Sequence, residues 1–230
     1  MKNLSLFEEK LGVVFGNKDL LRQALAHRSY LNENPDFALG HNERLEFLGD
    51  AVLELIVTEE LYARFPDKPE GDLTSFRAAL VNANMLADVA ALLEVNDFLL
   101  LSRGEAKDTG RARQYILANA FEAIMGAMYL DGGYDISKSF IHRVLLSHLE
   151  EVLEKKLYKD PKSLFQEIAQ EHAGITPTYE VVREWGPDHD KHFVVGIFLG
   201  SELVAEGEGI SKQTAQEDAA RKALEVKQWH

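Results

Sequence analysis

The hydrophobic periodicity of the chain changes once, close to Tyr158, and this change is the strongest constraint on its fold. Before that point, apolar residues recur every three or four positions in five segments, as expected of helices that bury one face. The segments are 20–26, 45–65, 73–93, 116–130 and 140–157. Breakers such as Asp131-Gly132-Gly133 separate them, and none shows the alternation of a strand. We therefore predict an all-α domain over residues 1–158.

After Tyr158 the pattern is that of a mixed domain. Asp160-Pro161 is a typical helix start, and the helix that follows, over 162–172, should end at Gly174. Runs rich in Val, Tyr, Phe and Ile predict three strands, and a last helix follows them. The strands cover 178–185, 193–199 and 202–208, and the helix covers 212–226. The order α-β-β-β-α predicts a small α+β domain over residues 159–230.

Composition excludes several classes of protein. The chain has no cysteine, so it has no disulfide, thiolate metal site or cysteine nucleophile. No uncharged apolar run approaches the ~20 residues of a membrane-spanning helix, and the N-terminal segment turns acidic before a signal core could form. We therefore expect a cytoplasmic protein without a membrane partner. The net charge is −13, from 25 basic and 38 acidic residues. The chain is therefore not a general polyanion binder, and any contact with nucleic acid must be made by a local surface whose shape fits it.

The densest group of acidic residues lies in the segment Asn42-Glu43-Arg44-Leu45-Glu46-Phe47-Leu48-Gly49-Asp50. On a helix, Glu43, Glu46 and Asp50 share one face, where their like charges destabilise the bare helix. Clusters of oxygen ligands suit Mg²⁺ or Mn²⁺. Spacing alone is equally compatible with a solvated acidic face. It also does not define the end of the site, because Glu54 continues the same stripe.

A second polar pair lies in a segment that is otherwise apolar, residues 116–124. Asn119 and Glu122 are one helical turn apart there, and a buried charge is costly unless it is paired or bound to a cation. An ordinary salt bridge at the edge of a buried helix is the alternative. Gly49 has no side chain beside Asp50, which is what the close approach of another helix would need.

At these positions the chain resembles bacterial ribonuclease III. The resemblance rests on residues 42–53, supported in the family's order by 24–30, 70–73, 102–105 and 119–122. The C-terminal part resembles a double-stranded-RNA-binding domain at 186–193 and 211–215. The resemblance implies an all-α endonuclease and dimerisation domain followed by an α+β RNA-binding domain. It also implies a homodimer.

The implied activity is hydrolysis of double-stranded RNA by an endoribonuclease that uses Mg²⁺, with Mn²⁺ as a possible substitute. The products would carry 5′-phosphate and 3′-hydroxyl ends with short 3′ overhangs. The substrates would include ribosomal RNA precursors and other structured transcripts. A non-catalytic RNA-binding or assembly factor on the same fold is the alternative. Retention of Glu46, Asp50 and Glu122 favours the enzyme.

The resemblance also assigns the candidate active-site residues by motif position. The metal ligands would be Glu46, Asp50, Asn119 and Glu122, of which Asp50 and Glu122 would be catalytic. Glu43 and Glu70 would be accessory acidic residues, and Phe47 would insert into the partner subunit. From the sequence alone an ordinary core role for Phe47 is equally compatible. The family often has Asp where this chain has Asn119, so the site carries one negative charge fewer.

Residues of both domains would contact RNA. A-form RNA is bound mainly through its shape and its 2′-hydroxyl groups, which requires few charges. In the second domain Gln166, Glu167 and His189 would enter minor grooves, and Lys212 would bind phosphates at a helix N-terminus. Gln213 stands where the family commonly has a second Lys. In the first domain a basic segment would contact phosphates through Arg103, Lys107, Arg111 and Arg113.

Overall fold

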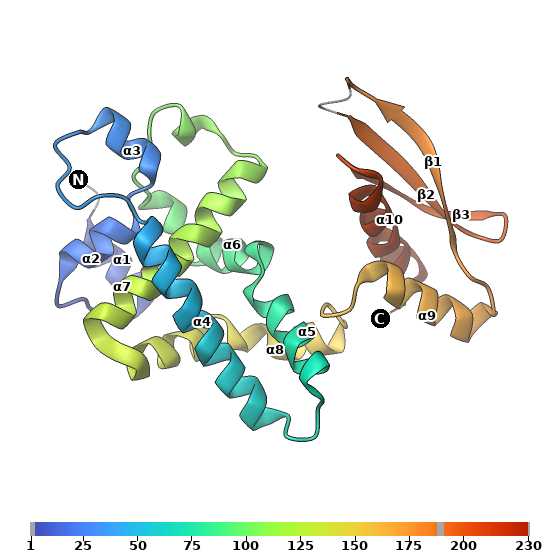
Figure 1. Ribbon diagram of the computed structural model, residues 1–230, viewed down its shortest axis with the longest axis horizontal. Helices are drawn as coiled ribbons and strands as arrows, with labels where there is room; N and C mark the ends of the chain where they lie inside the picture. Colours follow the sequence, from blue (N-terminus) through green and yellow to red (C-terminus); the bar gives the residue numbers. More distant parts are fainter. Residues whose placement is uncertain (1–2, 188–190, 230) are drawn as a thin grey trace. The chain divides into compact units, whose positions relative to one another are not determined.

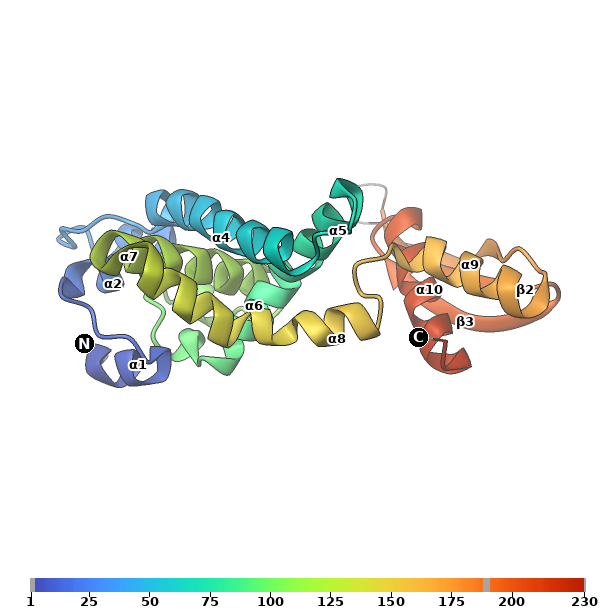
Figure 2. The same cartoon turned by 90° about the horizontal axis from the view of Figure 1, so that it is seen from below.

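The computed structural model describes residues 3–187 and 191–229 and divides into two compact units, Met1–Glu150 and Glu151–His230. Figures 1 and 2 show a helical first unit and a second unit that contains the only sheet drawn among these residues. The domain boundary after Tyr158 remains a prediction. No helix in the described ranges is both long enough and apolar enough to cross a membrane.

The first unit is helical, as predicted. Its α-helices are α1 (Leu4–Leu11), α2 (Lys18–Ala24), α3 (Arg28–Glu33), α4 (Glu43–Arg64), α5 (Glu70–Val81), α6 (Ala83–Leu92) and α7 (Arg111–Val144), and α8 (Leu149–Glu154) spans the division between the units. Short 3-10 turns are η1 (Val95–Asp97), η2 (Glu105–Lys107) and η3 (Leu146–His148). The long helices α4 and α7 cross each other and share the most extensive contact in the unit (Figure 1). Leu53 and Ile56 of α4 and Phe121 and Ile124 of α7 are fully buried there.

Two helix boundaries differ from the prediction. The apolar segment 73–93 forms two helices, because Asn82 is extended (φ −73°, ψ 158°) and its side-chain oxygen accepts hydrogen bonds from the backbone N–H groups of Asn84 and Met85. The break predicted at residues 131–133 is instead a kink within α7, where Gly133 has a φ of 77°. Glycine adopts that positive φ without the strain that a side chain would bring.

The second unit has the predicted order α-β-β-β-α. Its elements are α9 (Pro161–Ala173), β1 (Thr178–Trp185), β2 (His192–Leu199), β3 (Glu202–Gly209) and α10 (Lys212–Lys227). Asp160 caps α9 by accepting a 2.9 Å hydrogen bond from the Ser163 N–H, and Gly174 ends the helix with a φ of 66°. Ser211 caps α10 through its side chain.

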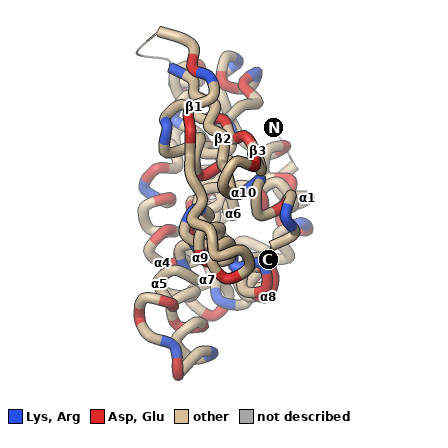
Figure 3. Tube along the Cα trace, turned by 90° about the vertical axis from the view of Figure 1, so that its right-hand side faces the viewer, with Lys and Arg blue, Asp and Glu red and all other residues tan. Residues whose placement is uncertain are grey.

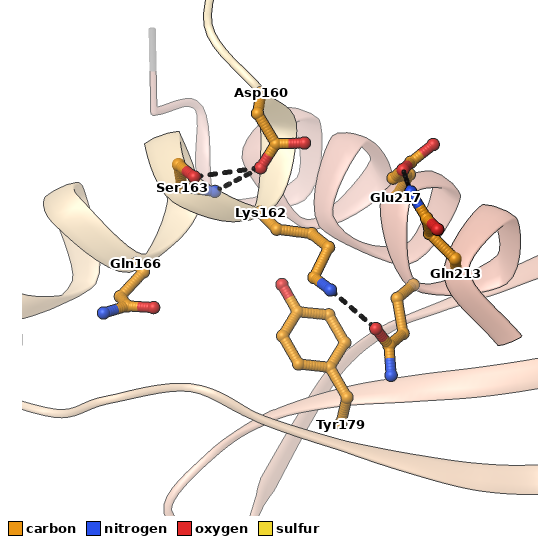
Figure 4. Close-up of a pocket in the computed structure, with 8 residues that line it drawn as sticks. Asp160, Lys162, Ser163, Gln166, Tyr179, Gln213 and Glu217 are labelled. Carbon is orange, nitrogen blue, oxygen red and sulfur yellow. Dashed lines mark hydrogen bonds between the residues drawn. The ribbon is translucent and has the colours of Figure 1, made fainter.

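The strands form one antiparallel sheet in the order β1-β2-β3. Ile197 on β2 lies opposite Tyr179 of β1 and Ala205 of β3. Helices α9 and α10 pack on one face of the sheet, where Phe165 and Ala219 join Ile197 in the core (Figure 2). This arrangement places the N-terminal turns of α9 and α10 side by side (Figure 4).

Candidate active site and nucleic-acid interface

The acidic residues of the first unit lie where α4 and α7 cross, and two glycines allow the crossing. A Cβ on Gly49 would overlap the Glu122 carbonyl and fall 2.8 Å from the Gly126 nitrogen. A Cβ on Gly126 would fall 3.1 Å from the Gly49 nitrogen and overlap the Leu45 carbonyl. The two backbones therefore touch. The close approach predicted at Gly49 is confirmed, and it brings the acidic face of α4 beside Glu122.

The carboxylates of this crossing interact with one another. Burial, followed by the charges of Asp50 and Glu46, raises the pKa of Glu122 from its ordinary value of 4.5 to about 7. Burial, followed by the charges of Glu43 and Asp50, raises the pKa of Glu46 above its ordinary value. Both shifts oppose ionisation, as expected of carboxylates that repel one another. We call Glu46, Asp50, Asn119 and Glu122 the acidic cluster.

The donor chemistry of the acidic cluster fits a hard divalent cation. Three carboxylates and one amide offer only oxygen atoms, which Mg²⁺ prefers. Asp50 and Asn119 are exposed, whereas Glu46 and Glu122 are half-buried. Within the described ranges, no three Asp, Glu, His or Cys side chains already form a group that could hold a metal ion. The crossing therefore brings the carboxylates of Glu46, Asp50 and Glu122 within electrostatic range of one another, and Asn119 lies one helical turn before Glu122 on α7.

The two accessory acidic residues occupy different places. Glu43, the first residue of α4, acts on Glu46 electrostatically, and its Oε1 lies 3.5 Å from Nη1 of the exposed Arg28. Glu70 begins α5 and does not contribute to the pKa of Glu46 or Glu122. It lines a hollow of about 450 Å³ beside the C-terminal half of α4, together with Tyr62. The structure thus brings Glu43 to the cluster and Glu70 elsewhere.

Phe47 is an exposed aromatic residue on α4, the helix that carries Glu46 and Asp50. Its side chain is 82% exposed, which excludes the ordinary core role that the sequence left open. Leu55 and Tyr62 further along α4 are also exposed, at 58% and 75%. The Phe47 side chain is therefore accessible for a contact outside its own fold.

The four cations of the predicted basic segment lie in the loop before α7 and in the first turn of α7. Arg103 and Lys107 have exposed side chains, and Arg111 begins α7 with a side chain outside the described structure. Arg113 instead donates hydrogen bonds to carbonyl oxygens, from Nη2 to Glu105 at 2.7 Å and from Nε to Asp108 at 3.0 Å, while its Nη1 is buried. Arg113 therefore stabilises the loop, and this geometry does not support its predicted phosphate contact.

Sequence reasoning missed the residues that fix this loop and α4 in place. The buried Asn42 precedes α4, donates from its side chain to the Ala24 carbonyl at 3.2 Å and from its N–H to the Ala26 carbonyl at 2.9 Å. Ser29 Oγ accepts a 3.1 Å hydrogen bond from the Ser102 N–H and lies 2.8 Å from His27 Nδ1. The motifs at 24–30, 42–53 and 102–105 contain these residues, but the motifs do not reveal which residues contact one another.

In the second unit, the predicted RNA contacts lie on α9 and at the start of α10. Gln166 and Glu167 are exposed on α9, and the Glu167 carboxylate pairs with Lys159 Nζ at 2.6 Å, which lowers the Glu167 pKa. Lys212 is exposed in the first turn of α10, with its Nζ 5.9 Å from the centre of the Phe193 ring. His189 lies outside the described residues.

A hollow of about 480 Å³ lies between the N-terminal turns of α9 and α10 (Figure 4). Its lining residues are Asp160, Lys162, Ser163, Gln166, Tyr179, Gln213, Gln216 and Glu217. Lys162 Nζ donates to Gln216 Oε1 at 2.6 Å and lies 5.4 Å from the centre of the Tyr179 ring. The lining is mostly polar, in contrast to a small-molecule pocket of the usual apolar kind.

Charges of both signs are interspersed along the trace in Figure 3. This pattern agrees with the acidic net charge and with binding through a few placed cations. It gives no support to a general attraction for polyanions.

Comparisons with known proteins match both units. A ribonuclease-III-like family model matches residues 17–149, and a double-stranded RNA binding motif matches residues 161–227. Ribonuclease 3 of Nitratiruptor sp. is 42% identical over 98% of this chain and 97% of its own length. Ribonuclease 3 of Desulforamulus reducens is 45% identical over 94% of this chain and 88% of its own length.

A solved structure is similar to the first unit. The nuclease domain of ribonuclease III from Campylobacter jejuni aligns with a TM-score of 0.58 at 41% identity, covering 63% of this chain and 97% of that domain. In that nuclease domain, a region involved in dimer formation is structurally flexible. The helical fold of the first unit and the α+β fold of the second are therefore those predicted from the sequence.

Proposed function

The chain belongs to the ribonuclease III family and is an endoribonuclease of that type, and on this premise we propose that it hydrolyses double-stranded RNA with a divalent cation at the acidic cluster. The observation that supports the site is the electrostatics of Glu122. Its pKa is raised to about 7 in a crossing that also holds Asp50 and Glu46. Carboxylates whose pKa values are raised by burial and by one another are typical of a functional site.

The proposed ligands are carboxylate oxygens of Glu46, Asp50 and Glu122 and the amide oxygen of Asn119. When bound, Mg²⁺ or Mn²⁺ would supply a more acidic water and neutralisation of charge on the leaving oxygen. The protein's own contribution is placement. Backbone contact at Gly49 and Gly126 fixes the origin of the ligands on α4 and α7. Asn42 fixes the start of α4.

The second unit binds the duplex, and the first supplies further cations. We propose that Gln166 and Glu167 contact sugar hydroxyls, that Lys212 contacts a phosphate, and that Arg103 and Lys107 contact phosphates near the cluster. His189 and Arg111 remain predicted contacts. Each of these cations is worth about one unit in the salt dependence of binding, or less.

We propose a homodimer, because one chain carries one acidic cluster and a duplex has two strands. The exposed Phe47 on α4 is the proposed contact with the partner subunit. Glu70 remains a proposed accessory acidic residue, although it does not lie at the acidic cluster of its own chain. Products with 5′-phosphate and 3′-hydroxyl ends and short 3′ overhangs belong to this proposal. So do ribosomal RNA precursors as substrates and a cytoplasmic location.

The direct test is incubation of the purified protein with a long RNA duplex, with Mg²⁺ and with chelator. We expect cleavage only with the cation, and Glu122→Gln should slow it by orders of magnitude while duplex affinity is retained. Cleavage by Glu122→Gln at the normal rate would contradict the assignment of the acidic cluster. The matched control is Glu54→Gln, which removes a carboxylate from the exposed surface of the same helix.

A further inference from the structure

We propose that Lys162 is a phosphate-binding residue for duplex RNA, placed on α9 so that its ammonium group serves the surface between α9 and α10. This inference rests on the proposed function of the second unit. It adds a contact from a residue to which the family resemblance and the comparisons assign no role.

The first observation is the direction in which Lys162 reaches. Lys162 lies in the first turn of α9, yet its Nζ donates to Oε1 of Gln216 on α10 at 2.6 Å. Figure 4 shows the side chain extending across the hollow between the two helices. The positive charge of Lys162 therefore lies beside α10, where the side chains of Gln213 and Gln216 are uncharged.

The second observation is that this charge is not neutralised by a direct partner. In the described part of the chain, no carboxylate forms an ion pair with Lys162, although many other lysines have one. The two acidic residues that line the hollow form hydrogen bonds with groups other than Lys162. Asp160 accepts hydrogen bonds from the N–H and Oγ of Ser163, and Glu217 accepts one from Gln213 Nε2 at 2.9 Å.

The third observation is a buried polar atom beside the same ammonium. The Tyr179 hydroxyl oxygen is buried and has no hydrogen-bond partner among the described residues. In Figure 4 this hydroxyl points towards α9, between Gln166 and Lys162. A buried hydroxyl without a partner is unusual and calls for one, either a ligand or a water.

These groups together match one sugar–phosphate unit of an RNA strand. The Lys162 ammonium has three N–H donors, of which Gln216 uses one, so donors remain for phosphate oxygens. Gln166, the predicted sugar contact, lines the same hollow and can both donate to and accept from a 2′-hydroxyl. The hollow thus joins the proposed contacts of α9 to that of Lys212 on α10.

The test measures binding of a short RNA duplex to the full-length protein in chelator, across a range of KCl concentrations. For Lys162→Met we expect a roughly tenfold loss of affinity and a fall of about one unit in the slope of log K against log salt. Lys162→Met/Gln216→Lys should restore the slope, because Gln216 stands within hydrogen-bond distance of the wild-type ammonium. The matched control is Lys227→Met, which removes a lysine paired with Glu202 at 2.8 Å and should leave the slope unchanged.

An unchanged slope in Lys162→Met would overturn the proposal, whatever happens to the melting temperature. A lower melting temperature with an unchanged slope would mean that Lys162 only braces α9 against α10. Failure of the wild-type protein to bind the duplex is a different result, because it would contradict the proposed function of the whole unit.

Discussion

At the scale of single residues, Glu122 is a half-buried acid whose folded environment opposes its charge. Its pKa is near 4.5 in the unfolded chain and about 7 in the folded protein, so the unfolded state ionises first as the pH rises. Stability is therefore lost as the pH rises from about 4.5 to 7, and none of this loss is present below that window. The loss is on the order of 2 kcal/mol after allowance for partial exposure.

Glu122→Gln removes this loss, which gives a prediction for the metal-free protein. In chelator at pH 8 we expect the variant to melt several degrees above the wild type. At pH 4.5 the two melting temperatures should converge. Thermal unfolding followed by circular dichroism at both pH values checks this. Equal melting temperatures at pH 8 would show that Glu122 is not held in the repulsive environment described above.

Asn119 gives a second prediction at this scale. A neutral amide oxygen binds a divalent cation less strongly than a carboxylate, and it also repels its acidic neighbours less. We expect Asn119→Asp to shift the Mg²⁺ dependence of cleavage several-fold to lower concentration and to lower the melting temperature in chelator. Asn96→Asp, which adds the same charge at an exposed position on η1, is the control. Superimposable Mg²⁺ titrations would contradict direct ligation by Asn119.

Individual residues also show where sequence reasoning stops. The role of Gly49 could be predicted, because a glycine beside a charged residue on a helix indicates the close approach of another element. Arg113 could not, because its partners are carbonyl oxygens of an irregular loop that has no periodicity. In the sequence, Glu43 and Glu70 are both acidic residues within motifs. Only the folded structure shows that Glu43 lies close to Glu46 and that Glu70 does not.

At the scale of elements, the crossing of α4 and α7 depends on backbone contact, and this can be tested with glycine substitutions. Gly49→Ala inserts a methyl group where the Glu122 carbonyl already lies, so the helices must separate. We expect a loss of several kcal/mol in unfolding free energy and a loss of cleavage. Chemical denaturation and a cleavage assay measure the two effects.

Gly71→Ala is the matched control, because a Cβ at Gly71 on α5 meets nothing within 4 Å. A helical glycine in open space gains up to about 1 kcal/mol on replacement by alanine. The control should therefore be neutral or slightly stabilising. If Gly49→Ala behaved in the same way, the tight crossing would be wrong.

The elements themselves were largely predictable. In the second unit, caps and strand composition gave the helices and strands to within a residue or two, because Asp160, Gly174 and Ser211 act locally. The predicted helix boundaries were wrong at two places where the same local sequence signal is compatible with two structures. Asn82 ends one helix by capping the next inside an unbroken apolar pattern, and Gly133 only kinks a helix that tertiary packing continues.

At the scale of the whole molecule, the acidic cluster and the proposed RNA-binding surface of α9 and α10 lie in separate compact units. We expect a protein that lacks residues 160–230 to keep cation-dependent cleavage at low salt, because all four cluster residues lie upstream. Its duplex affinity should fall strongly, and the fall should grow with salt. Cleavage and binding assays at low and moderate KCl check this, with the full-length protein as reference. Complete loss of cleavage at low salt, in a fragment that retains its helical circular dichroism, would contradict the division of roles.

The contact between Gly49 and Gly126 also has a consequence for the thermodynamics of cation binding. The Cα positions of the proposed ligands are fixed when the protein folds, so most of their conformational entropy would be lost before a cation binds. Only a few side-chain rotamers remain to be ordered, at roughly 0.5–1.5 kcal/mol for each side chain. Preorganisation of this kind leaves the affinity of the site dependent mainly on ligand charge, which is the property that differs at Asn119.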